Sequence, residues 1–293
     1  MSISIIKSNV ESLRDPFVLV ENEKYYMYGG SEYEGEWIAY KSEGDLTRWE
    51  KIDHKIVEEP PNLLKNRWAP EVHKYNGRFY MFTTYFSSNT NHRGCTVMVS
   101  DSPEGVFKEI TNGHITPHDW DCIDGTLYID ENGQPWMVFV HEWTCTDDGI
   151  GRMAAAKMSE DLTHFISEPI ELFRADAPSW ANNRVTDGCF MYRTADDRLL
   201  MIWSNFDING GYCVGVAHSE NGKIDGKWVQ EERIFSKEIS GKYDGGHGMI
   251  FTGLDGQKYL SVHSPNSPTE DGRREQPIFI PIAEKNGTLV CCE

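Results

Sequence analysis

The chain has 293 residues, of which 39% are hydrophobic and 12% aromatic, and it carries a formal net charge of −18. This composition is sufficient for a buried core, and no apolar run approaches the roughly 18 residues that span a bilayer. Nucleic acid is a poor partner for so acidic a chain, because binding it requires a basic surface that releases counterions.

Five similar stretches follow one another along the sequence. Each has an acidic or polar opening, an apolar strand, a Gly, Asn or Asp turn and a second strand rich in aromatic residues. They are RDPFVLVENEKYYMYGG from Arg14, APEVHKYNGRFYMFTTY from Ala69, IDGTLYIDENGQPWMVFV from Ile123, TDGCFMYRTADDRLLMIWS from Thr186 and GHGMIFTGLDGQKYLSVH from Gly246. A long repeat with β patterning inside it is typical of a propeller blade.

The second half of each repeat also recurs, as an apolar strand, a polar turn and an outer strand that begins near Trp or Phe. The copies are EWIAYKSEGDLTRWEKI from Glu36, GCTVMVSDSPEGVFKEI from Gly94, GRMAAAKMSEDLTHFIS from Gly151 and GYCVGVAHSENGKIDGKWVQ from Gly211. The fifth repeat keeps its strands in REQPIFIPIAEKNGTLV but loses the turn motif. Neither a sustained helical period nor a linker divides the chain. We predict an all-β fold, a five-bladed β-propeller, forming a single domain over residues 1–293.

The openings of the repeats carry the candidate functional residues. Because equivalent positions of the blades converge on the axis of a propeller, these side chains are expected to meet there. They are Asp15, Glu71, Asp124, Asp187 and His247. Crowded buried carboxylates are costly unless they are paired, hydrated or functional, and they push one another's pKa values apart, which yields an acid and a base in one pocket. A single Asp beside Gly or Pro is usually a turn residue, but three in register favour a functional site.

Tryptophans accompany the acids. Trp68 and Trp143 lie in nearby loops or strands, as do Trp180 and Trp203. Flat apolar faces suit a sugar ring and carboxylates suit its glycosidic bond, whereas some of the nine tryptophans are expected simply to pack in the core. The pattern therefore predicts an oligosaccharide substrate.

At this point the motifs RDPF, WAPEVHKYNGRFYMF, IDGTLYIDENGQPWMVF and TDG…LLMIWS, in this order, resemble glycoside hydrolase family 43 from Leu13 to about Pro281. That family is a five-bladed propeller that hydrolyses arabinosides and xylosides with inversion. The resemblance implies that Asp15 is the general base, that Asp124 orients the acid and tunes its pKa, and that the acidic residue of the fourth blade is the general acid.

The fourth blade departs from the family pattern. The family usually has Glu-Gly-Pro there, whereas this chain has Asp187-Gly188-Cys189. Because Asp is one methylene shorter than Glu, a second residue is a candidate for the acid. We expect Asp187 to serve, with Glu142 in VHEWT as the alternative.

Further residues are expected to contact the sugar, namely Trp68, Glu71, Trp143, His247 and Arg274. The resemblance also implies that His247 lies on the axis, where it can bind a structural Ca²⁺; hard calcium prefers oxygen ligands, so a structural histidine is the competing interpretation. No cofactor is expected to be required.

Two alternatives remain open at this level. The propeller could bind carbohydrate without cleaving it, or could act on another furanoside such as a β-galactofuranoside. Seven cysteines without a CxxC pair indicate reduced thiols, and the opening MSISIIKSNVESLRDP lacks the pattern of a signal peptide. We therefore expect a cytoplasmic protein, secreted if a leader was removed, that acts on short oligosaccharides in the exo mode. The sequence does not indicate an oligomeric state.

Overall fold

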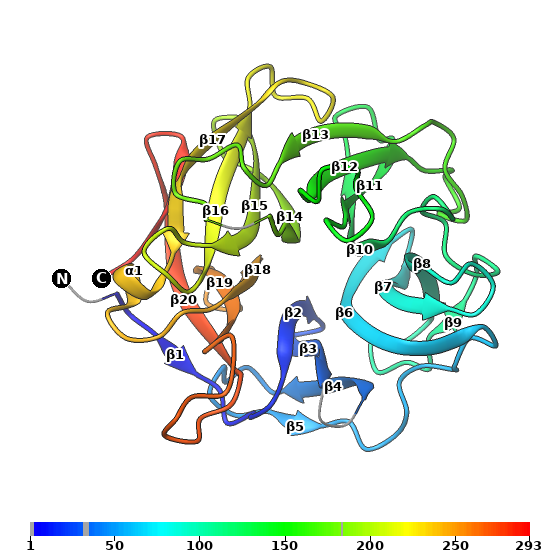
Figure 1. Cartoon of the computed structure of the whole chain (residues 1–293). Coiled ribbons are helices and arrows are strands. Elements are labelled where there is room, and N and C mark those ends of the chain that lie inside the picture. The colour runs from blue at the N-terminus through cyan, green and yellow to red at the C-terminus, as the bar shows by residue number, and fades with distance from the viewer. Residues whose placement is uncertain (1–2, 32–34, 183) are drawn as a thin grey trace.

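Five antiparallel sheets stand side by side around a common axis in the computed structural model, which describes residues 3–31, 35–182 and 184–293 (Figure 1). The predicted all-β, five-bladed propeller is confirmed. In the first four blades the strands lie in chain order from the axis outward. Their bounds are β2 (Arg14–Glu21), β3 (Lys24–Ser31), β4 (Glu36–Ser42) and β5 (Glu50–Lys51); β6 (Leu63–Tyr75), β7 (Arg78–Ser87), β8 (Arg93–Ser100) and β9 (Lys108–Glu109); β10 (Cys122–Ile129), β11 (Pro135–His141), β12 (Arg152–Lys157) and β13 (Ile170–Arg174); and β14 (Asp187–Arg193), β15 (Leu199–Phe206), β16 (Tyr212–Ser219) and β17 (Trp228–Phe235).

The fifth blade joins the two ends of the chain. It contains β18 (Gly246–Thr252), β19 (Lys258–Ser264) and β20 (Gln276–Lys285), and β20 pairs with both β1 (Ile6–Lys7) and β21 (Thr288–Cys291). The backbone N–H of Ser4 donates to the carbonyl of Cys292 at 3.1 Å, so the terminal segments lie side by side (Figure 1). A short helix, α1 (Lys237–Ser240), precedes this blade, and no described helix is long and apolar enough to cross a membrane.

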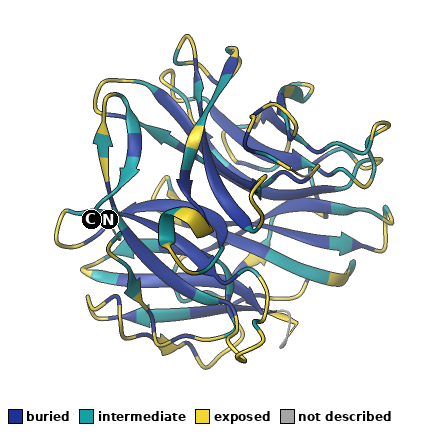
Figure 2. Ribbon diagram, turned by 60° about the vertical axis from the view of Figure 1, so that its left-hand side comes forward, coloured by how far each residue is buried: buried dark blue, intermediate teal, exposed yellow. Residues whose placement is uncertain are grey.

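Apolar side chains fill the spaces between neighbouring blades, and buried residues follow the strands while the exposed ones gather in the connections (Figure 2). Between the fourth and fifth blades, Ile202 and Val214 pack with Leu260 and Ile280, all of them 0% exposed. Burying one such side chain stabilises the fold by about 1.5–3 kcal/mol. The apolar strands read from the sequence therefore correspond to sheets that are buried on both faces.

Each inner strand carries a bulge at the same register, and this irregularity positions the axial side chains. At the bulge one residue has a left-handed backbone. The five φ values are 55° at Asp15, 42° at Ala69, 56° at Asp124, 54° at Gly188 and 51° at His247. A left-handed conformation costs a residue with a Cβ about 1–2 kcal/mol. Four of the blades accept this cost at the same place, so the bulge is a designed feature of the repeat.

The sequence predicted that the acidic residues at the blade openings occupy equivalent positions, but relative to the bulges they do not. Asp15 and Asp124 occupy the left-handed position, but Asp187 precedes it and Glu71 follows it by two residues. Because side chains of a strand alternate between faces, and a bulge adds one residue, these small offsets redirect each carboxylate.

Candidate active site

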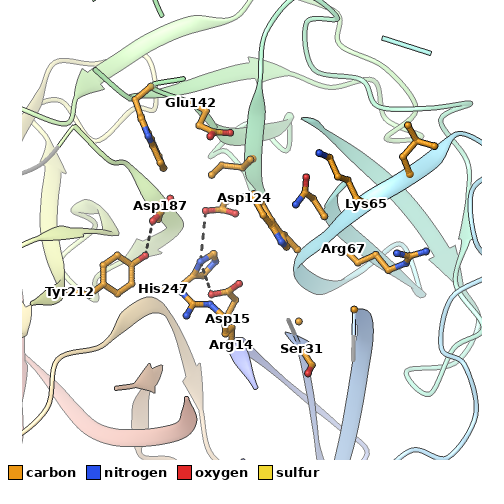
Figure 3. A pocket seen from close by; sticks show the side chains of 17 residues that line it. Arg14, Asp15, Ser31, Lys65, Arg67, Asp124, Glu142, Asp187, Tyr212 and His247 are labelled. Atoms are coloured by element: carbon orange, nitrogen blue, oxygen red, sulfur yellow. Dashed lines mark hydrogen bonds and ion pairs between the residues drawn. The ribbon is translucent and has the colours of Figure 1, made fainter. Parts of the chain in front are cut away.

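A cavity of about 520 Å³ lies where the bulges meet on the axis (Figure 3). Four predicted residues from four different blades line it together. They are Asp15 of β2, Asp124 of β10, Asp187 of β14 and His247 of β18. The residues are far apart in the chain, so only the closed ring of blades brings them together.

His247 lies among the three aspartates. Its Nδ1 is 3.1 Å from Oδ1 of Asp15 and 3.8 Å from Oδ2 of Asp124. Burial by itself would lower the pKa of His247, but the charges of Asp15, Asp124 and Asp187 outweigh it and raise the pKa. The imidazolium thus partly neutralises the carboxylates around it.

Asp15 is the carboxylate that ionises most readily. Burial would raise its pKa, but the positive charges of His247 and Arg14 outweigh burial and lower it. Its backbone N–H donates to Nδ1 of His263 at 3.2 Å, and Nε2 of His263 lies 3.2 Å from Oδ1 of Asn266. Burial lowers the pKa of His263 to about 3, so this ring is neutral, accepts at Nδ1 and donates from Nε2.

Asp124 and Asp187 hold protons more strongly. Burial and the neighbouring Asp15 raise the pKa of Asp124 to about 6, although His247 and the N–H of Gly188, which donates to Oδ2 at 2.9 Å, act in the opposite direction. Burial and the charge of Asp124 raise the pKa of Asp187 to about 8. At neutral pH the cavity thus contains an ionised Asp15 and a protonated Asp187, the separation that acid–base catalysis needs.

Two contacts fix Asp187. The Tyr212 hydroxyl, from the start of β16, donates to its Oδ2 at 3.0 Å (Figure 3). Gly188 follows in the left-handed conformation, and a Cβ at this position would lie 2.8 Å from the Cα of His247. Glycine therefore lets the fourth and fifth blades approach closely enough to place Asp187 beside His247.

Glu142 also lines the cavity, but both of its oxygens are engaged. Nε and Nη2 of Arg93 donate to them at 2.6 and 2.9 Å, and the backbone N–H of Arg93 donates to Asp121. A bidentate guanidinium–carboxylate pair stabilises the anion and occupies the oxygens that would carry a transferable proton. In this geometry Glu142 is a poorer proton donor than Asp187.

The predicted tryptophans divide into two groups. Trp68 and Trp143 are half-buried and line the cavity, and the Arg93 guanidinium lies 5.7 Å from the Trp68 ring centroid. Trp203 is fully buried and packs 5.3 Å from Trp180, so both belong to the core. The cavity therefore offers two aromatic side chains beside its carboxylates.

Two of the predicted substrate contacts lie elsewhere. Glu71 is buried, pairs with Nε2 of His73 at 3.0 Å and is absent from the cavity lining, because it lies two residues beyond the bulge. Arg274 lines a second cavity near Lys242 and Tyr243, because the loop before β20 carries it away from the axis. Neither side chain lines the axial cavity, and their contact with a substrate stays a prediction.

Several lining residues were missed from the sequence. Tyr212 is recognisable only as the start of a third strand. Arg14 is the first residue of the RDPF motif, and its guanidinium donates to Asn266. The long β6 begins before the repeat motif and supplies Lys65 and Arg67 as a side of the cavity (Figure 3). Only the polar residues around WAPEV gave any signal for this extension.

The fit of an axial metal ion can be judged from the donors. Among residues 3–31, 35–182 and 184–293, no group of three or more His, Cys, Asp or Glu side chains is arranged to hold one. His247 directs Nδ1 at Asp15 instead. A structural Ca²⁺ on the axis stays a prediction.

Comparison with known proteins adds the following. The model of the family described as glycosyl hydrolases family 43 matches residues 9–282. An endo-arabinase structure from Bacteroides thetaiotaomicron VPI-5482 is 37% identical, with a TM-score of 0.85 over 98% of this chain and 100% of that one. Among curated proteins, an extracellular endo-α-(1→5)-L-arabinanase of Bacillus subtilis (strain 168) is 27% identical over 46% of this chain and 45% of its own length.

A second curated relative is an extracellular exo-α-(1→5)-L-arabinofuranosidase of Cellvibrio japonicus (strain Ueda107). It is 26% identical over 52% of this chain and 45% of its own length. The chain thus spans about half the length of the curated relatives that it matches.

Proposed function

Because the chain belongs to glycosyl hydrolases family 43, we propose that it is an inverting glycosidase that cleaves α-L-arabinofuranosyl linkages in oligosaccharides. The observation that supports this most is the set of three buried aspartates around His247, whose pKa values are shifted in different directions. A binding protein has no use for a carboxyl held protonated near pH 7 beside an ionised one, whereas glycoside hydrolysis needs both.

The proposed reaction is a single displacement. Asp15 takes a proton from a water molecule as the water oxygen attacks the anomeric carbon. Asp187 gives its proton to the glycosidic oxygen as the bond from that oxygen to the anomeric carbon breaks. The products are a sugar of inverted anomeric configuration and a free alcohol. Asp15 then releases its proton to solvent, and Asp187 takes up a proton from solvent, which restores the starting state.

Asp124 and His247 take supporting roles in this proposal. The carboxylate of Asp124 keeps the pKa of Asp187 high and aligns it through the N–H of Gly188. The positive charge of His247 keeps Asp15 ionised. Trp68 and Trp143 offer their ring faces to the sugar, because apolar sugar faces pack well on aromatic rings.

Arabinofuranosyl linkages are the first choice of substrate because the 37% identical structural relative is titled an endo-arabinase. The two curated relatives named above act on α-1,5-linked arabinan in the endo and exo modes, according to their names. Xylosides are the second choice. The exo mode stays a prediction that a product analysis decides.

The test compares hydrolysis of p-nitrophenyl α-L-arabinofuranoside, β-D-xyloside and β-D-galactofuranoside, and of α-1,5-arabino-oligosaccharides. The wild type and the variants Asp15→Asn, Asp187→Asn and Glu142→Gln are measured together, and proton NMR records the first anomer formed. On the arabino-oligosaccharides, whose leaving alcohol must be protonated, we expect Asp15→Asn and Asp187→Asn each to lose at least about a thousandfold in kcat, and Glu142→Gln far less. On the p-nitrophenyl glycosides, whose nitrophenolate leaves without a proton, Asp187→Asn should lose less than Asp15→Asn.

Other results would point elsewhere. A retained first anomer would contradict the single displacement. An inactive Glu142→Gln beside an active Asp187→Asn would transfer the acid role to Glu142. If the wild type cleaves none of these substrates but binds an arabino-oligosaccharide, the protein is a carbohydrate-binding propeller.

A further inference from the structure

Four backbone N–H groups at the axis bond to side chains of the preceding blade. That of Gly188 bonds Asp124 itself, whereas the other three bond residues of the second strand. The donors of these three bonds are the axial left-handed residues that also have an ionisable side chain, Asp15, Asp124 and His247. The bonds run from Asp15 to Nδ1 of His263 (3.2 Å), from Asp124 to Oγ1 of Thr84 (3.0 Å) and from His247 to Oγ of Ser204 (2.9 Å). All three acceptor residues are 0% exposed.

The acceptors share one position in the blade. In every sheet this is the second-strand residue that pairs with the residue before the bulge. The five residues at the position are Gly30, Thr84, Val140, Ser204 and His263. A single position of the repeat thus decides whether the second strand of a blade offers an acceptor to the next blade.

The type of residue at this position correlates with the type of left-handed residue in the next blade. Gly30 and Val140 have no hydrogen-bonding side chain, and the blades after them place Ala69 and Gly188 at the left-handed position. Neither of those residues can ionise. At this second-strand position, acceptors therefore occur in the three blades that precede an ionisable left-handed residue, and not in the two others. The third blade bonds the N–H of Gly188 through Asp124 instead.

We propose that Thr84, Ser204 and His263 are positioning residues, which fix the axial ionisable side chains by holding their backbones in the left-handed conformation. A residue with a Cβ is strained at positive φ and persists there only when its surroundings determine it. A hydrogen bond to the N–H supplies that constraint. Without this bond the backbone relaxes and the axial side chain changes direction. This inference rests on the proposed function only in taking Asp15, Asp124 and His247 as the residues whose side chains must be held in a fixed direction.

The competing explanation is that these bonds only join neighbouring blades. Both explanations predict lower stability when an acceptor is removed. They differ at Asp124, because this carboxylate raises the pKa of Asp187. If Thr84 fixes the direction of the Asp124 side chain, removing the Thr84 hydroxyl also changes the pKa of Asp187. If the bond only joins two blades, its removal leaves the pKa of Asp187 unchanged.

The decisive variant is Thr84→Val, which keeps the side-chain shape and removes the acceptor, with Thr84→Ser as the conservative rescue. Thr96→Val is the matched control, since Thr96 is equally buried but its hydroxyl bonds Glu109 and Thr111 in the outer part of the blade. Steady-state kinetics against pH and thermal unfolding are measured for all three, on the best substrate found for the wild type.

For Thr84→Val we expect kcat to fall about tenfold with KM within about twofold, because one buried hydrogen bond is lost and substrate contacts remain. The alkaline limb of the kcat profile should move to lower pH, because a displaced Asp124 no longer raises the pKa of Asp187. Thr84→Ser should restore both, and Thr96→Val should lower the melting temperature alone. A Thr84→Val variant that behaves as Thr96→Val does in all readouts would overturn the proposal.

A second readout does not depend on activity. Carboxyl-¹³C-labelled aspartate gives the titration of Asp124 and Asp187 directly, and amide exchange reports the N–H of Asp124. We expect faster exchange at Asp124 and a lower titration midpoint for Asp187 in Thr84→Val only; unchanged titrations would refute the positioning role. If the wild type cleaves no glycoside, these measurements still decide the positioning role, and the proposed hydrolysis fails separately.

Discussion

Tyr212→Phe tests the acid role of Asp187 through a single hydrogen bond. The Tyr212 hydroxyl donates to Oδ2 of Asp187 at 3.0 Å, and burial together with nearby carboxylates raises the pKa of Tyr212 well above its ordinary value, so the hydroxyl keeps its proton. A hydrogen bond to a carboxylate favours the ionised form, and it therefore lowers the pKa of Asp187 against the larger raising effect of burial. Removing the hydroxyl should raise that pKa further.

The size of the shift follows from the strength of the bond. A buried hydrogen bond to a charged group contributes about 1.5 kcal/mol, which corresponds to about one pKa unit. We expect the alkaline limb of kcat to move to higher pH by about one unit in Tyr212→Phe. The plateau below it should fall by less than about tenfold, because a weaker acid still delivers its proton.

The assay is the pH dependence of kcat on the best arabino-oligosaccharide, whose leaving alcohol needs the acid, from pH 5 to 10, with Tyr259→Phe as the control. Tyr259 likewise donates to an aspartate, at 2.7 Å to Asp255, but in a hairpin turn remote from the cavity. The control should keep the wild-type profile. An alkaline limb that stays in place in Tyr212→Phe, or moves to lower pH, would refute the assignment of that limb to Asp187.

Three further outcomes are expected. Asp187→Asn should raise the melting temperature by about 6 °C more at pH 8 than at pH 5. The pKa of Asp187 is raised from 3.8 to about 8 in the folded chain, so its contribution to stability is lost as the pH rises through that window, and the loss between pH 5 and pH 8 is about 4 kcal/mol. Equal gains in calorimetry at both pH values would contradict the raised pKa. Asp187→Glu should lower kcat about tenfold although it restores the residue usual in the family, since an added methylene crowds Tyr212 and Asp124, and a gain in kcat would show that Asp187 is not seated as described. Glu142→Gln should weaken substrate binding, seen as a higher KM, while the pH limbs of kcat stay in place; a shifted limb would indicate that Glu142 titrates during the reaction.

The repeats allowed the fold and the meeting of Asp15, Asp124, Asp187 and His247 to be predicted, because equivalent strands of a propeller share one axis. The catalytic roles given to these residues stay predictions. The sequence could not show in which direction each carboxylate points, because a bulge inserts one residue and has no sequence signature of its own. Glu71 lies outside the cavity lining for this reason.

Side-chain contacts between segments far apart in the sequence were equally hard to foresee. Arg93 engages Glu142 and Tyr212 engages Asp187 across 49 and 25 residues, and each pairing depends on the rotation between strands rather than on a motif. Arg274 seemed able to reach the axis from its place in the sequence, but the path of the loop before β20 decides otherwise. Local patterns fix which residues form strands, whereas long-range packing decides which side chains meet.

The side-by-side placement of the two ends of the chain has a consequence for folding kinetics. Asp15 follows the N-terminal strand, and its N–H bonds His263 in the last blade, so the base is held across the seam at which the ring closes. Contacts between such distant segments form slowly, because loop entropy must be lost before they form. During refolding, individual blades can therefore acquire their strands before any turnover is possible. Recovered activity should lag behind recovered β-sheet signal and report the moment at which the seam closes.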